Sequence, residues 1–167
     1  RLNDWAQDDA VLVAAAHATG ADVAVCLSSR ACVMRGIGDQ VGPALDVAVP
    51  QVLLVNPRRY CATPAVFQAL ALPAGKSTHA PMRSDADIVA GWMTMANDLQ
   101  PAAIALVPEI ATMLAVLGGM EGCQCARMSG SGATCFGVFS DAASCAAAQA
   151  DMERLHPEWW SARTALM

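Results

Sequence analysis

The chain has 167 residues, a formal net charge of −5 and 55% hydrophobic residues. This length holds one domain, or one domain with part of another, and the apolar content is ample for a core. An acidic chain without a basic cluster argues against nucleic acid as a partner. No apolar stretch approaches the roughly 20 residues that span a membrane, and no signal peptide is evident.

The first 50 residues predict one helix followed by extended segments. Asp8 or Asp9 can cap a short helix over residues 11–17, which Gly20 ends. Three further segments follow in order: an apolar approach to a strand over residues 21–27, a strand over residues 31–35 and a turn over residues 36–39.

From residue 51 onward the predicted order is β-α-α-α-β-β-α-β, which is typical of an α+β fold with an antiparallel sheet backed by helices. The predicted elements are a strand over residues 51–55, a helix over 65–70, a helix over 85–96, a helix over 102–117, strands over 123–128 and 133–139, a helix over 142–155 and a strand over 159–166.

Local signals set several of these boundaries. Thr63 is the expected N-cap of the first helix, with Pro64 at its first helical position. Residues 97–101 end the helix over 85–96, and Asp141 with Ser140 caps the helix that starts at residue 142. The helix over 102–117 has one apolar face at helical spacing, made of Ile104, Val107, Ile110, Met113, Leu114 and Leu117. Residues 71–84, with prolines and Gly75, are the expected mobile loop.

The cysteines and histidines show no metal-binding pattern. Seven cysteines are present, and the close pair Cys123-x-Cys125 lacks the spacing of a zinc site. An odd number of cysteines on apolar segments predicts reduced, buried thiols in a cytoplasmic protein.

The run Ser129-Gly130-Ser131-Gly132 is the most informative part of the chain. Two glycines in three residues suit neither a helix nor a central strand, because each costs order and buries no side chain. Such a segment fits where backbone approaches a phosphate held by N–H groups, or another glycine loop. The simpler alternative is a tight turn between two elements. The following strand and capped helix favour an organised site.

Four segments of the chain resemble the galactokinase–homoserine–mevalonate–phosphomevalonate (GHMP) kinase superfamily, and within it the 4-diphosphocytidyl-2-C-methyl-D-erythritol kinases. The four segments are Gly20–Cys26 with Gly36–Asp39, Asn56–Pro57 with Ala62–Phe67, Asn97–Pro101 with Pro108–Ile110, and Arg127–Phe136. The last segment resembles the third motif of the superfamily, and the resemblance covers nearly the whole chain.

This resemblance implies a ferredoxin-like C-terminal, substrate-side domain over residues 49–167, preceded over residues 1–48 by the end of the N-terminal domain. It implies ATP-dependent phosphorylation of the 2-hydroxyl of 4-diphosphocytidyl-2-C-methyl-D-erythritol, in non-mevalonate isoprenoid biosynthesis, with Mg²⁺ on the nucleotide. The glycine-rich ATP loop of the family has no match in the chain, which begins at Arg1 rather than Met. We therefore expect a fragment that is inactive alone, with the ATP and Mg²⁺ sites mainly upstream.

The resemblance also assigns roles to single residues. Asp22 matches the catalytic aspartate, whose carboxylate would orient the acceptor hydroxyl and take its proton. From local sequence alone, Asp22 would be a cap or turn residue. Ala24 stands where the family usually has proline. Ile37 matches an apolar position that lines the substrate, although isoleucine is more commonly a core residue.

The same resemblance places the cytosine ring of the substrate on Phe67, with Thr63 and Pro64 beside it. Stacking on an aromatic face is a common way to bind a base. The alternative is a core phenylalanine on an amphipathic helix. The segment Ser129, Gly130, Ser131 and Gly132 would lie against the diphosphate or the phosphate loop, and its backbone N–H groups would bind.

Two other functions are compatible with the sequence. The first is another kinase of the superfamily, acting on homoserine or a mevalonate-like substrate. The second is a non-catalytic ligand-binding or interaction domain of ferredoxin-like fold. For the kinase, the expected partner is a small-molecule substrate that bears a cytidine diphosphate, without nucleic acid or membrane, and the sequence does not predict the oligomeric state.

Overall fold

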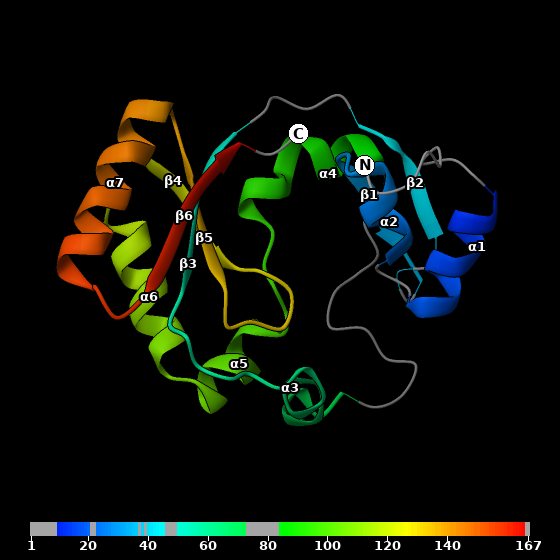
Figure 1. Ribbon diagram of the computed structural model, residues 1–167, viewed down its shortest axis with the longest axis horizontal. Coiled ribbons are helices and arrows are strands. Elements are labelled where there is room, and N and C mark those ends of the chain that lie inside the picture. Colours follow the sequence, from blue (N-terminus) through cyan, green and yellow to red (C-terminus); the bar gives the residue numbers. More distant parts are fainter. Residues whose placement is uncertain are drawn as a thin grey trace. The chain divides into compact units, whose positions relative to one another are not determined.

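The computed structural model (Figure 1) describes residues 10–20, 23–36, 38, 40–45, 50–72 and 84–165. The chain divides into two compact units: residues 1–48 with 83–90 and 167, and residues 49–82 with 91–166. The two-domain division at residues 48 and 49 stays a prediction, since residues 83–90 group with the first unit. Most of the loop predicted to be mobile, residues 73–83, lies outside the described residues.

The first unit contains short helices and a two-stranded antiparallel hairpin. Its elements are α1 (Ala10–Thr19), α2 (Val23–Ser28), β1 (Cys32–Arg35), β2 (Gln40–Ala44) and most of α4 (Asp85–Gly91). The predictions of a helix before Gly20 and of a strand from about residue 31 are confirmed. The Asp8 and Asp9 caps lie outside the described residues.

One sequence prediction in this unit is wrong, and one strand was not predicted. Residues 23–28 form a helix that packs on α1 instead of an approach to a strand. A short apolar run carries no periodicity that separates the two states, so packing on a neighbour decides it. Strand β2 was not predicted because it contains Gly42 and Pro43. A Cβ at Gly42 would lie 3.0 Å from the Val33 carbonyl oxygen, so the glycine allows the two strands to approach closely.

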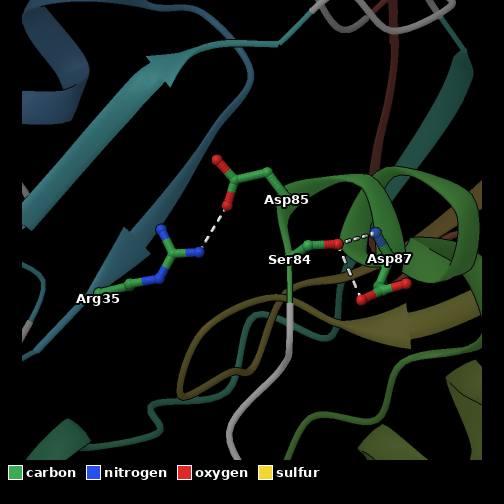
Figure 2. Close-up of polar contacts among 4 residues, drawn as sticks. All are labelled: Arg35, Ser84, Asp85 and Asp87. Carbon is green, nitrogen blue, oxygen red and sulfur yellow. Dashed lines mark hydrogen bonds and ion pairs between the residues drawn. The ribbon is translucent and has the colours of Figure 1, made fainter.

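Helix α4 begins with a side-chain cap and an ion pair, which Figure 2 shows. Ser84 Oγ accepts a hydrogen bond from the Asp87 amide (3.2 Å) and donates one to Asp87 Oδ2 (2.9 Å). Arg35, at the end of β1, pairs with Asp85. The pair is partly exposed, so it contributes only about 0.2–1 kcal/mol. The predicted helix over 85–96 is wrong in length: α4 ends at Gly91 and a 3₁₀ turn, η1 (Trp92–Thr94), follows.

The second unit is built on a four-stranded sheet. The strands are β3 (Gln51–Asn56), β4 (Cys123–Met128), β5 (Cys135–Phe139) and β6 (Trp160–Ala165), in the order β4-β5-β3-β6. All neighbouring pairs are antiparallel, with Leu54 opposite both Phe136 and Ala162. The predicted α+β class with an antiparallel sheet backed by helices is confirmed.

Helices α6 (Glu109–Gly118) and α7 (Ala142–Leu155) cover the same face of this sheet (Figure 1). Alternate strand residues face these helices, because side chains alternate along a strand. The fully buried members of this core include Leu53, Val55, Ile110, Met113, Leu117, Met128 and Met152. Asp141 caps α7 as predicted, accepting a 2.8 Å hydrogen bond from the Ser144 amide.

The predicted helix over 102–117 is in fact two helices, α5 (Gln100–Leu106) and α6. Proline has no N–H and disfavours helical geometry in the residue before it, so Val107–Pro108 separates them. The predicted apolar face survives the break. Val107, Ile110, Met113 and Leu117 are buried, and Ile104 and Leu114 pack against the core.

Candidate functional site

The residues Ser129–Gly132, here called the glycine loop, connect β4 to β5. Two hydrogen bonds close the loop: the Ser129 amide donates to the Thr134 carbonyl (2.9 Å) and the Gly132 amide donates to the Ser129 carbonyl (3.0 Å). Gly130 and Gly132 have φ of +53° and +89°, a region that side chains disfavour. A Cβ at Gly132 would lie 2.9 Å from Met128 Sδ, whereas one at Gly130 would meet nothing within 4 Å.

The glycine loop offers two backbone donors. Within the described part of the chain, the amides of Gly130 and Ser131 donate to no protein acceptor. Ser129 and Gly130 are exposed, and Ser131 is half-buried. Adjacent N–H groups in a turn with positive φ form a concavity that suits an anion. The arrangement can therefore bind phosphate oxygens without a basic side chain.

Asn97 and Gln100 hold the chain at Met128, just before these donors, and Asn97 also holds the Gly130 carbonyl between them. Asn97 Nδ2 donates to the carbonyl oxygens of Met128 (2.9 Å) and Gly130 (2.8 Å), and Asn97 Oδ1 accepts from the Leu99 amide (3.0 Å). Gln100 Oε1 accepts from the Met128 amide (3.1 Å). In the sequence, Asn97 belongs to a segment that breaks a helix and that carries part of the family resemblance, but no contact with the glycine loop was predicted for it. An asparagine three residues before the first residue of a helix is the signal that could have indicated an anchored turn.

Helix α3 (Thr63–Leu70) starts beside the glycine loop. The prediction of Thr63 as N-cap is wrong: the cap position is Ala62, without a side-chain hydrogen bond, and Pro64 is the second helical residue. The Thr63 hydroxyl instead makes a 2.7 Å hydrogen bond with Ser131 Oγ. The Cys61 thiol donates to the Ser131 carbonyl (3.4 Å). Two segments predicted separately are therefore in contact.

The Phe67 side chain projects from α3 into solvent. It is 56% exposed, whereas its neighbour Val66 is fully buried. Pro64 is also exposed. The alternative of a core phenylalanine does not hold, because the core side of α3 is occupied by Val66. An exposed aromatic ring on a helix that contacts the glycine loop can accept a planar base.

The other two predicted site residues, Asp22 and Ile37, lie outside the described residues. They also belong to the first unit, whereas α3 and the glycine loop belong to the second. Their roles in catalysis and substrate binding remain predictions. Of the predicted site residues that the structure describes, Thr63 and Ser131 are in contact through their hydroxyls.

Arg127 supports the strand that leads into the glycine loop. Its guanidinium donates to the carbonyl oxygens of Met95 and of Trp92 (2.8 Å), and it lies over the Phe136 ring, 5.6 Å from the centroid. Its Nε is buried without a partner. The residue therefore ties η1 to β4 through charge-assisted hydrogen bonds and a cation–π contact.

An open groove of about 540 Å³ lies at another place in the second unit. It is lined by Pro57, Arg58, Arg59, Glu109, Thr112, His156, Glu158 and Trp159. An ion pair joins Arg59 to Glu109 (3.0 Å), and His156 Nδ1 lies 3.3 Å from Glu158 Oε1. It contains no predicted site residue. Opposite charges balance along its walls, which gives it no preference for an anion.

Three buried or half-buried thiols are held protonated, and the described residues contain no metal-binding cluster. All seven cysteines are free. Burial raises the pKa of Cys135 to about 12 and also raises the pKa values of Cys123 and Cys145, so these three thiols are protonated at neutral pH. No group of three or more His, Cys, Asp or Glu in the described ranges could hold a metal ion. None of the described helices is long and apolar enough to cross a membrane.

Comparison with protein families and curated proteins gives consistent matches. Residues 77–158 match the family described as GHMP kinases C terminal. The chain is 44% identical over 172 residues to a 4-diphosphocytidyl-2-C-methyl-D-erythritol kinase of Rhodopseudomonas palustris (strain BisB18), covering 96% of this chain and 56% of that protein. It is 43% identical to a kinase of the same name from Methylorubrum extorquens, covering 99% and 59% of the two chains.

Two further matches agree with these. A Paracoccus denitrificans (strain Pd 1222) protein of the same name is 47% identical over 153 residues, covering 90% of this chain and 56% of that protein. A crystal structure of 4-(cytidine 5'-diphospho)-2C-methyl-D-erythritol kinase superposes with a TM-score of 0.72 at 25% identity, covering 91% of this chain and 56% of that chain. The chain thus spans less than two thirds of the length of the relatives it matches.

Proposed function

The chain is a homologue of the 4-diphosphocytidyl-2-C-methyl-D-erythritol kinases with a GHMP kinase C-terminal domain, and from this premise we propose that the gene product containing it phosphorylates the 2-hydroxyl of 4-diphosphocytidyl-2-C-methyl-D-erythritol. ATP is the phosphoryl donor, and the reaction belongs to non-mevalonate isoprenoid biosynthesis in the cytoplasm.

The observation that carries the proposal beyond homology is the contact between α3 and the glycine loop. The Thr63 and Ser131 hydroxyls are hydrogen-bonded at 2.7 Å, so a helix with an exposed aromatic ring contacts the glycine loop. Two amides of that loop donate to no acceptor among the described residues. A cytidine diphosphate has both a planar base and an anionic diphosphate. This surface therefore offers a partner of matching chemistry to each part of the substrate.

Each site residue then has a defined task. Asp22 accepts the proton of the 2-hydroxyl as its oxygen bonds to the γ-phosphorus, while the bond from that phosphorus to the β,γ-bridging oxygen breaks and ADP leaves. Phe67 stacks on the cytosine, with Thr63 and Pro64 beside it, and Ile37 lines the substrate. The glycine loop binds the diphosphate of the substrate or supports the phosphate loop of the ATP site.

Mg²⁺ would accompany ATP and neutralise charge on the transferred phosphoryl group. The described residues contain no cluster of acidic, histidine or cysteine side chains that fits a metal ion. The proposal therefore assigns no Mg²⁺ ligand to them and no step to a group they hold.

A substrate comparison tests the proposal. The complete gene product, with ATP and Mg²⁺, should phosphorylate 4-diphosphocytidyl-2-C-methyl-D-erythritol with a much higher kcat/KM than homoserine or mevalonate. A preference for either of the latter would move the protein to another GHMP kinase activity. Tight binding of the cytidine substrate without any phosphorylation would indicate a non-catalytic ligand-binding domain.

A further inference from the structure

We infer that Asn97 is a positioning residue that holds the glycine loop in its anion-binding conformation. The functional part of this inference rests on the proposed kinase activity, whereas the structural part does not. The contacts that carry it are the two hydrogen bonds from Asn97 Nδ2 to the carbonyl oxygens of Met128 (2.9 Å) and Gly130 (2.8 Å), here called the Asn97 clamp.

The orientation of the Asn97 amide follows from its partners. Carbonyl oxygens only accept hydrogen bonds and the Leu99 amide only donates one. Nδ2 must therefore face Met128 and Gly130, and Oδ1 must face Leu99. Both Nδ2 hydrogens are used, one for each carbonyl, so Asn97 joins a point before the loop to a point inside it.

The loop needs such support because packing does not provide it at Gly130. A Cβ at Gly130 would meet nothing within 4 Å, and the residue is exposed. Glycine also loses more conformational entropy on ordering than any other residue. Among the described residues, the hydrogen bond from the half-buried Asn97, which is 33 residues away in sequence, is the side-chain hydrogen bond that anchors the Gly130 carbonyl.

The Asn97 clamp also determines what the loop presents to a ligand. A carbonyl oxygen carries negative partial charge and would repel a phosphate. Here the Met128 and Gly130 carbonyls are engaged by Asn97, while the Gly130 and Ser131 amides bind no acceptor among the described residues. Because the two carbonyl oxygens are engaged by Asn97 and the two amides are available, the loop favours an anion over a cation.

Two amide-to-acid substitutions provide a matched test. Asn97→Asp keeps the acceptor for Leu99 but cannot donate to the two carbonyls. Gln100→Glu adds the same charge three residues away but keeps its function, because its oxygen only accepts from the Met128 amide. Any effect of a new negative charge near the loop is common to both variants. The difference between them therefore reports the Asn97 clamp.

Amide hydrogen exchange followed by NMR tests the structural part. In the unmodified chain, the Asn97 side-chain protons should exchange more slowly than those of an exposed asparagine, a measurement that needs no variant. In Asn97→Asp, the Ser129 and Gly132 amides, which are bonded within the loop, should lose protection, while Gln100→Glu keeps it. Fast exchange of the Asn97 side chain, or equal protection in the two variants, overturns the inference.

Kinetics in the complete gene product test the functional part. Asn97→Asp should lower kcat/KM by about 10²-fold, the loss that a misplacement of about 1 Å can cause in an active site, and Gln100→Glu should stay within a few-fold of the unmodified enzyme. Equal losses in the two variants would assign the effect to charge and overturn the functional role. If the unmodified enzyme phosphorylates none of the three substrates, the proposed function fails, and the exchange data alone decide the role of Asn97.

Discussion

Replacing Phe67 with alanine separates a substrate-binding role from a packing role. Fully burying a phenylalanine contributes about 1.5–3 kcal/mol, but Phe67 is 56% exposed. Less than half of that free energy is therefore at stake, and an exposed position leaves no cavity. We expect Phe67→Ala to lower the free energy of unfolding by about 1 kcal/mol, well below the roughly 3–5 kcal/mol of a core phenylalanine.

The neighbouring Val66 provides the matched control on the same helix. It is fully buried, so Val66→Ala removes two carbon atoms at about 0.8 kcal/mol each and leaves a cavity, at a total cost of about 2–3 kcal/mol. The smaller residue should thus cause the larger loss of stability. Urea unfolding of the two variants, followed by circular dichroism, measures this difference.

Substrate titration of the same two variants in the complete gene product completes the test. If Phe67 stacks on cytosine, Phe67→Ala should weaken binding of the cytidine-bearing substrate by about 1–3 kcal/mol, which is about 5- to 150-fold in Kd. ATP affinity should stay unchanged, and Val66→Ala should retain both affinities. A Phe67→Ala variant with normal substrate affinity would refute stacking and remove the main residue-level support for a cytidine substrate.

Four other predictions can be checked directly. The isolated 167-residue chain should show no phosphorylation above a blank, since it spans less than two thirds of its relatives; measurable turnover would contradict this. In the complete gene product, Asp22→Asn should lower kcat by roughly 10²–10⁴-fold with little change in KM, and a change of only a few-fold would make Asp22 structural. Gly132→Ala should cost about 2–5 kcal/mol in urea unfolding, from positive φ and a contact with a buried sulfur. At Gly130 only the positive φ opposes an alanine, so Gly130→Ala should cost about 1–2 kcal/mol. If both variants lost the same free energy of unfolding, the contact between Gly132 and Met128 would be contradicted. Hydrogen bonds from the Ser144 amide and hydroxyl hold the pKa of Asp141 below its ordinary value. This stabilisation is therefore present above the unfolded-state pKa and lost as pH falls through the folded-state pKa. Asp141→Ala should lower the melting temperature at neutral pH and have much less effect in strong acid; a pH-independent difference would contradict the linkage.

The sheet and the main helices could be predicted because their signals are local. Strand β4 and helix α7 begin and end where the pattern of apolar residues and the Asp141 cap indicate. The errors occurred where a longer-range contact or a single residue decided the outcome. Pro108 divides a continuous apolar face into two helices without changing which residues are buried.

The candidate site shows the same limit. The glycine loop is visible in the sequence as Ser-Gly-Ser-Gly, but the residues that hold it are not adjacent to it. Thr63 has the sequence signature of an N-cap, yet its hydroxyl bonds Ser131, 68 residues away. Asn97 resembles a helix breaker and instead binds two carbonyls of the loop. The local sequence predicts which secondary structure a polar residue favours, but not the distant group with which its side chain forms a hydrogen bond in the folded protein.

The strand order has a consequence for synthesis of the chain on the ribosome. Strand β3 is central in the sheet and includes the buried residues Val52, Leu53 and Val55. Its two neighbours, β5 and β6, begin only at Cys135 and Trp160. At roughly 5–20 residues per second, β3 has neither hydrogen-bonding partner for several seconds after it is made. During that time it is an apolar, β-branched segment with two open edges, which is the kind of segment that pairs with other chains. The nascent chain is therefore most prone to aggregation before β5 and β6 have emerged, and β6 closes the second edge of β3.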